Sequence, residues 1–215
     1  GVAIGNPGGA TNQPSLSVTG TITGADAGTT IAVFDGTTQV GVGTISGGTW
    51  SANVTLGNGS NVLTAEVTDA AGNTATSGPV TYTLNTTAPT GGTPALTAAS
   101  DSGTSQSDDI TDVTAPTFTV ALGSTVVAGD TVQLLLGGSA LAHPVTHTIT
   151  TADITAGSVS LTVTAGDLGA DGSKSITAQF SDVAGNTSTT AADVITLDTT
   201  APVVAITSSG GATNQ

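Results

Sequence analysis

The sequence predicts an all-β protein that consists of two tandem β-sandwich domains. Three observations predict this class: short runs in which apolar and small polar residues alternate, turn signals between those runs, and internal repeats. The chain has 215 residues, a length that suits one or two domains. Of its residues 37 % are hydrophobic and only 2 % aromatic, so Ala, Val, Leu and Ile supply most of the apolar content. Their alternation with Thr and Ser distinguishes the chain from a disordered linker.

The predicted strands carry their apolar residues at every second position, which buries one face of each strand and leaves the other in water. In the first half the sets are Leu16/Val18/Ile22, Ile31/Val33, Trp50/Ala52/Val54, Leu63/Ala65/Val67 and Val80/Tyr82/Leu84. In the second half they are Phe118/Val120/Leu122, Val132/Leu134/Leu136, Val159/Leu161/Val163, Ile176/Ala178/Phe180 and Ile195/Leu197. Turn signals such as Asp35-Gly36 and Asn58-Gly59 separate the sets. About seven short strands per domain is typical of an immunoglobulin-like sandwich. The single short helix candidate lies at 150–156.

Two internal repeats divide the chain. Residues 68–90 recur as residues 181–203, each copy with an acidic residue, a turn, a strand and a Thr-Thr-Ala-Pro segment. Residues 2–13 recur as residues 204–215, with nine of twelve positions identical. We therefore predict a first domain at 1–88, a second domain at 89–201, and the start of a further copy of the first domain at 202–215. Arrays of this kind are typical of tandem repeats and not of single compact enzymes.

The charge balance narrows the possible partners. There are 15 acidic residues against one basic residue, Lys174, which gives a formal net charge of −14. Nucleic acids and anionic membranes need Lys and Arg contacts, so we expect neither as a partner. The carboxylates must be solvated or must bind cations, and calcium is the oxygen-seeking candidate. The chain has no Cys, which excludes disulfides and thiol chemistry, and it has no apolar run long enough to span a membrane.

Several short motifs together resemble one known family. They are Asp69-Ala-Ala-Gly-Asn73, Asp182-Val-Ala-Gly-Asn186, the joint Leu197-Asp198-Thr-Thr-Ala-Pro202, and the Asp-rich stretch 100–112. Nearly the whole chain is similar to the bacterial Ig-like repeats of giant, type I-secreted, RTX-type and biofilm-associated adhesins. The resemblance implies a secreted protein at the cell surface, a stalk that projects an adhesive tip, and joints stiffened by calcium. The first joint departs from the pattern because Asn85 stands where the second joint has Asp198.

These motifs lead to a calcium hypothesis with one site at each joint. Four carboxylates, Asp101, Asp108, Asp109 and Asp112, lie close in sequence with no basic residue nearby. Like charges repel, and calcium relieves this with oxygen ligands in flexible geometry. For the first joint we expect ligands from Asp69, Asn85 and Asp101 together with Asp108 or Asp109. For the second joint we expect Asp182 and Asp198. Because Asn85 supplies a neutral oxygen, the first joint is expected to bind calcium more weakly or through another set of ligands.

The competing interpretation is that these Asp residues cap local turns. Asp130 suits both roles equally, whereas Asp35 and Asp171, each followed by Gly, suit turns.

Other functions find little support in the sequence. We expect Trp50 in the core, with a sugar-stacking platform as the alternative. His143 and His147 are only two imidazoles, fewer than a structural zinc site needs. No nucleophile elbow is present, so we expect no enzyme. The predicted function is a monomeric structural spacer whose partners are calcium ions and the neighbouring domains of the same chain. The alternative is an adhesion module that binds a glycan or a protein.

Overall fold

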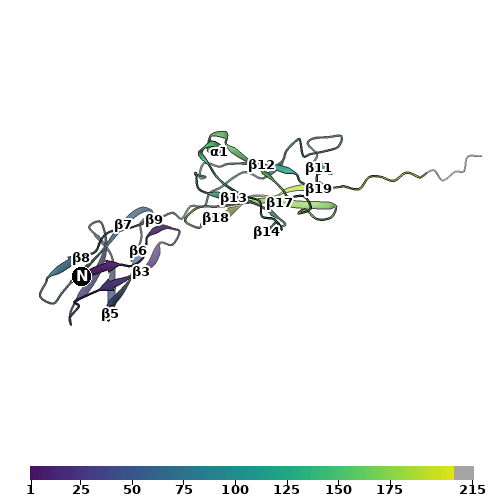
Figure 1. Ribbon diagram of the computed structural model, residues 1–215. Helices are drawn as coiled ribbons and strands as arrows, with labels where there is room; N and C mark the ends of the chain where they lie inside the picture. The colour runs from purple at the N-terminus through teal and green to yellow at the C-terminus, as the bar shows by residue number, and fades with distance from the viewer. Residues whose placement is uncertain (206–215) are drawn as a thin grey trace, which may run out of the picture.

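The structure is a computed structural model that describes residues 1–205. Two β domains follow one another end to end, and an extended segment leaves the second domain at its far end (Figure 1). The predicted all-β class with two tandem sandwiches is confirmed. In the described residues the helix content is limited to α1 (Thr151–Ala156). Most of the predicted further copy at 202–215 lies outside the described residues.

The first domain is a single hydrogen-bonded path of strands that folds over on itself. The path runs β1-β3-β6-β5-β4-β7-β9-β2, and β8 pairs with β7. Its strands are β1 (Val2–Ile4), β2 (Gly9–Thr11), β3 (Ser15–Ile22), β4 (Thr30–Asp35), β5 (Thr38–Ser46), β6 (Thr49–Thr55), β7 (Gly59–Thr68), β8 (Thr74–Thr76) and β9 (Val80–Leu84).

The fold-over occurs in β5, which changes partner halfway along its length. Its first half pairs with β4 and its second half, from Gly43 on, pairs with β6. A Cβ atom at Gly43 would lie 2.3 Å from the side chain of Ile31, and one at Gly41 would lie 2.7 Å from the carbonyl oxygen of Asn53. The small residues in this strand therefore let the two layers approach closely.

The second domain has two separate sheets. A three-stranded sheet has the order β10-β12-β16, and a seven-stranded sheet has the order β11-β19-β17-β13-β14, with β15 on β13 and β18 on β17. The strands are β10 (Ala95–Leu96), β11 (Ile110–Thr111), β12 (Thr117–Ala121), β13 (Thr131–Leu136), β14 (Ser139–Ala140), β15 (Thr146–Thr148), β16 (Ser158–Thr162), β17 (Gly172–Ser181), β18 (Thr187–Thr189) and β19 (Asp193–Leu197).

Each domain encloses its own apolar core, and the predicted period-two faces form it. In the second domain Phe118 and Phe180 are fully buried at the centre of the cluster. In the first domain Trp50 is 2 % exposed, and its indole N–H donates to the carbonyl oxygen of Ala3 at 3.1 Å. The expected core position of Trp50 is confirmed, and the side chain offers no platform for a sugar.

The two domains share a topology that gives each of them two chemically distinct poles. At one pole a short strand runs parallel to the last strand: β2 pairs with β9, and β11 pairs with β19. At the other pole lies the Asp-x-Ala-Gly-Asn turn that follows the long strand β7 or β17. Because the last strand of the first domain leads into the second, the parallel-strand pole of the first domain faces the turn pole of the second.

Candidate interdomain metal site

The site at the joint starts from Asn85, the first residue after β9. Its side-chain amide donates to Oδ2 of Asp182 in the second domain at 2.8 Å. In return, the side-chain amide of Asn186 donates to the backbone carbonyl of Asn85 at 2.7 Å. Asn12 also lies nearby, since a Cβ atom at Gly185 would be 3.6 Å from its Nδ2. Residues almost one hundred positions apart thus hold the two domains together.

Asp182 is held in place by its own turn. Its Oδ1 accepts hydrogen bonds from the backbone amides of Ala184 and Asn186 at 2.9 and 2.8 Å, and its Oδ2 accepts one from Nδ2 of Asn186 at 2.8 Å. The first domain repeats this arrangement, with Asp69 in place of Asp182 and Asn73 in place of Asn186. These bonds lower the pKa of Asp69, with the side chain of Asn73 as the largest cause. Asp69 and Asp182 therefore cap local turns, as the alternative interpretation expects. Asp182 in addition accepts a hydrogen bond across the joint.

The connecting segment is built into the second domain. Pro89 is buried, and its carbonyl accepts a hydrogen bond from the hydroxyl of Ser188. The amide of Thr90 donates to the hydroxyl of Thr125 at 2.9 Å, and Gly91 forms an isolated β-bridge with Leu122. A chain fixed in this way has little freedom to swing, in contrast to a Gly-Ser tether.

A second carboxylate, Asp130, lies near Asp182, because the next residue, Thr131, pairs with Ser181. Asp130 is 1 % exposed, and its Oδ2 accepts a hydrogen bond from the amide of Val127 at 2.9 Å. Its Oδ1 is buried and has no hydrogen-bond partner within residues 1–205. Burial raises the pKa of Asp130, the bond from Val127 opposes that shift, and the negative charge of Asp182 adds to it. A buried oxygen without a partner, close to a second carboxylate, is costly unless a cation or a proton compensates it.

The ligand grouping expected for the first joint is wrong. Asp69 does not approach Asn85, because it follows the end of β7, whereas Leu84 at the end of β9 pairs with Gly59 at the start of β7. Asp69 and Asn85 therefore occupy opposite poles of the first domain. Asp182, expected at the second joint, lies at the first joint instead.

The Asp-rich stretch is also at the wrong pole for the first joint. Leu197 pairs with Gly172 at the start of β17, whereas Asp182 follows its end, about 30 Å away along a ten-residue strand. At this far pole Asp112 and Asp198 line an open hollow of about 220 Å³.

The remaining members of the stretch have different surroundings. Asp108 is exposed and accepts a hydrogen bond from the amide of Ile110. Asp101 and Asp109 lie further inside the domain, joined by a bond from the amide of Asp109 to Oδ2 of Asp101 at 3.2 Å.

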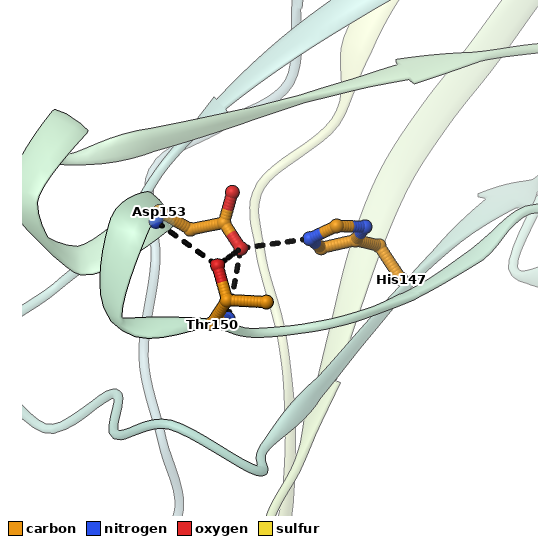
Figure 2. A network of polar contacts seen from close by, with 3 residues as sticks. All are labelled: His147, Thr150 and Asp153. Atoms are coloured by element: carbon orange, nitrogen blue, oxygen red, sulfur yellow. Dashed lines mark hydrogen bonds and ion pairs between the residues drawn. The ribbon is translucent and has the colours of Figure 1, made fainter.

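The two histidines do not form a common site. Nδ1 of His143 pairs with Asp167, and Nε2 of His147 pairs with Asp153, each at 2.9 Å. Figure 2 shows that Asp153 also accepts from Thr150, whose hydroxyl and amide lie 2.6 and 2.8 Å from its Oδ2. This is the capping box that starts α1. The histidines thus fasten local structure.

No three His, Asp or Glu side chains in residues 1–205 lie close enough together to hold a metal ion between them. Among the described helices none is long and apolar enough to cross a membrane. An interdomain metal would therefore need backbone and amide oxygens in addition to Asp130 and Asp182.

Comparison with solved structures supports the fold. The fibronectin(III)-like modules of Clostridium thermocellum CbhA match with a TM-score of 0.52 at 15 % identity, covering 92 % of this chain and 93 % of theirs. A Ca²⁺-stabilized adhesin that helps an Antarctic bacterium bind ice matches at 26 % identity with a TM-score of 0.47, covering 94 % of this chain and 50 % of that one. A 1.5-MDa bacterial ice-binding adhesin matches at 25 % identity with a TM-score of 0.42, covering 91 % of this chain and 62 % of that one.

Comparison of sequences identifies the family. No curated protein sequence matches the chain. The family description of the bacterial Ig-like domain matches twice, at residues 6–86 and 87–199, and so accounts for nearly all of the chain. Immunoglobulin-like and fibronectin-like domains are typically structural and non-enzymatic. The chain belongs to the family of bacterial Ig-like domains.

Proposed function

We propose that this chain is a spacer segment in the stalk of a long, secreted bacterial surface adhesin of the RTX type, with calcium ions at its joints. In this role it has no catalytic function and supports adhesion and biofilm formation by holding a binding tip away from the cell. The observation that carries the proposal is the joint itself, where Asn85 of the first domain bonds to Asp182 of the second. The two domains lie end to end (Figure 1), and the anchored linker between them supports a stiff arrangement.

Calcium suits the joint because the oxygens it prefers are gathered there. Oδ1 of Asp130 is buried without a partner in the described residues, and Asp182 adds a second carboxylate. The carbonyl of Asn85 and the side-chain amides of Asn85 and Asn186 meet at the carboxylate of Asp182. If the side-chain amides of Asn85 and Asn186 flip by 180°, their oxygens take the places of their NH2 groups. The joint then offers further oxygen ligands to calcium, which takes about six to eight.

The far pole of the second domain offers a more acidic version of the same end. Strand register makes Asp112 the counterpart of Asn12, because each follows a Thr that pairs with the last Leu of its domain. It likewise makes Asp198 the counterpart of Asn85, and both donate their backbone amides to the carbonyl of that Thr at 2.9 Å. Two carboxylates in place of two amides support stronger calcium binding at the second joint than at the first.

The test is small-angle scattering and calorimetry on the whole chain, with calcium and with a chelator. Calcium is expected to narrow the range of interdomain angles and to raise the melting temperature of the second domain. Asp130→Asn with Asp182→Asn should abolish the narrowing. Asp26→Asn, at an exposed residue away from the joint, should leave it intact. Equal flexibility and equal melting temperatures in both buffers would remove calcium from the proposal and leave the spacer role.

The alternative, a module that binds a glycan or a protein, is less well supported. Such a module needs an exposed aromatic or apolar patch. Trp50, Tyr82, Phe118 and Phe180 are all buried, which leaves half-buried Phe34 as the only other aromatic residue of the chain. The hollow next to Trp50 is lined by Gly, Ser and Thr residues and the edge of the indole. Binding on a glycan array would favour this alternative.

A further inference from the structure

Asp101 is a buried carboxylate that nothing else in the second domain explains. It follows β10 in the segment that crosses from one sheet to the other, and it is 2 % exposed. Its Oδ2 accepts one hydrogen bond, from the amide of Asp109. Its Oδ1 has no partner in the described part of the chain. A buried carboxylate oxygen in this position has lost its hydration without a protein partner to compensate it.

Two further carboxylates lie next to Asp101, and one of them comes from a distant part of the chain. Asp109 is half-buried, and its carbonyl accepts from the amide of Thr196 at 2.7 Å, which fixes it against β19. Asp193 starts β19 and accepts a hydrogen bond from the amide of Leu96 at 3.2 Å. Burial raises the pKa of Asp193, and the negative charges of Asp109 and Asp101 raise it further.

No cationic side chain neutralises this group. Within residues 1–205 the carboxylates that contact a basic side chain are Asp167, at His143, and Asp153, at His147. Lys174, the single Lys of the chain, donates its ammonium to the carbonyl of Ala170. Three partly or fully buried carboxylates therefore lie together and repel one another.

The first domain has no counterpart of these three carboxylates, so the sandwich fold does not itself require them. The register of the last strands places Val80 at the position of Asp193, because Leu84 corresponds to Leu197. No acidic residue precedes Asp26 in the first domain, so nothing corresponds to Asp101 or Asp109 there. A sandwich of this family thus forms without the three carboxylates, and their presence in the second domain calls for a ligand.

We propose that the second domain binds a calcium ion of its own between Asp101, Asp109 and Asp193, separate from the ion at the joint. Zinc prefers nitrogen and sulfur ligands, and magnesium requires near-ideal octahedral geometry, whereas calcium accepts carboxylates, carbonyls and waters in flexible arrangements. The three side chains do not yet converge on one point. The segment before β11 is already bonded to β19 through Asp109, and the ion reinforces this contact and so stabilises the pole that carries Asp112 and Asp198.

The experiment counts ions and measures stability on the whole chain. Native mass spectrometry and calorimetric titration with calcium chloride are carried out on the wild type, on Asp101→Asn with Asp193→Asn, and on Asp130→Asn with Asp182→Asn. The first pair of substitutions should remove one ion and leave the joint ion, and the second pair should do the reverse. Asp108→Asn is the matched control, because Asp108 is an exposed neighbour outside the proposed site. Undiminished binding by the Asp101/Asp193 variant would refute the internal site without affecting the joint.

Thermal unfolding supplies a second readout whose sign distinguishes a binding site from a merely structural group. At calcium about one hundred times its Kd, the melting temperature of the second domain should rise by about 10 °C. In chelator the Asp101/Asp193 variant should melt above the wild type, because it lacks the unpaired buried charges. In calcium it should melt below the wild type. A variant that is less stable than the wild type in both buffers by the same amount would overturn the proposal.

If the Asp101/Asp193 variant fails to fold, an NMR titration of the wild type still tests the internal calcium site. Calcium titration followed by amide NMR should shift the signals of Asp109 and Leu96, whose N–H groups bond to the carboxylates of the site. The amide of Val80 should not shift. No change at Asp109 and Leu96 up to millimolar calcium would refute the internal site.

Discussion

The contact between Asn85 and Asp182 makes Asn85→Asp the most informative single substitution in the chain. The side chain keeps its size, but its amide nitrogen, which donates to Oδ2 of Asp182 at 2.8 Å, is replaced by a carboxylate oxygen. In the absence of a cation the two side chains then repel each other, and the joint is expected to open. With calcium the new oxygen becomes a ligand, and the joint is expected to close again.

The size of the effect follows from two contributions. A hydrogen bond to a charged group contributes about 1.5–3 kcal/mol. Two unit charges about 4 Å apart repel by about 1 kcal/mol in water, and by about 4 kcal/mol at the effective dielectric constant of a protein surface. The smaller value of each contribution gives about 2.5 kcal/mol, which shifts the balance between closed and open joints by roughly 70-fold.

The assay is a distance distribution between spin labels, one in each domain. The chain has no Cys, so Thr37→Cys, at an exposed turn position, and Ser139→Cys, at the exposed start of the short strand β14, introduce unique attachment sites. In chelator Asn85→Asp should broaden the distribution relative to the wild type, and calcium should remove most of the difference. Asn53→Asp adds the same charge at an exposed residue in the middle of β6 and should change nothing. A distribution for Asn85→Asp in chelator that equals that of the wild type would refute the role assigned to this contact.

Three further predictions concern the second domain. Phe180→Ala empties a fully buried position and should destabilise this domain by about 3–5 kcal/mol in calorimetry, with the melting of the first domain unchanged. Gly91→Ala places a Cβ 2.3 Å from the ring of Phe180 and should cost about 1–3 kcal/mol, whereas Gly78→Ala, with open space around it, should cost far less. His147 and Thr150 lower the pKa of Asp153 to about 2, so ionised Asp153 stabilises the fold above pH 4 and loses this effect as the pH falls toward 2. Asp153→Asn should therefore be destabilising at pH 6 in thermal melts, by an amount that shrinks as the pH falls below 4 and is lost below pH 2.

The strands were predictable because their pattern depends only on which face is buried. Alternation placed Val18, Val33 and Leu134 in the cores, where all three are fully buried. The sequence offered a helix or a short turn at 150–156, and the structure has a helix there, which Thr150 and Asp153 start with a capping box and Gly157 ends in a left-handed conformation. The fold-over in β5 was not predictable, because it depends on the close contacts of Gly43 with its partner Ile31 in β4 and of Gly41 with Asn53 in β6.

The metal site was predicted only in part, and the reason is geometric. Closeness in sequence misleads here, because the 15 residues between Asp69 and Asn85 contain β8 and β9 and so carry the chain from one pole to the other. Counting that extended stretch would have separated the two residues. The sequence could not show that Asp130 is buried next to the joint, because a buried carboxylate and a turn-forming one look alike in sequence. Asp193 was missed because it opens an ordinary strand.

The different ends of the two domains give a reason for unlike domains to alternate in an array, as the internal repeats predict. At the first joint the carboxylates Asp130 and Asp182 belong to the second domain, and the first domain presents the neutral Asn85, which bonds to Asp182 without any cation. If residues 202–215 begin a further copy of the first domain, as the sequence predicts, the next joint sets Asp198 against the counterpart of Asp69. Two carboxylates facing each other across a joint repel unless calcium lies between them. The first joint should therefore hold in chelator better than the second, and the stalk should divide into rigid pairs of domains when calcium is withdrawn. An array of identical domains would instead soften at every joint at the same calcium concentration, so scattering from a four-domain fragment at decreasing calcium separates the two behaviours.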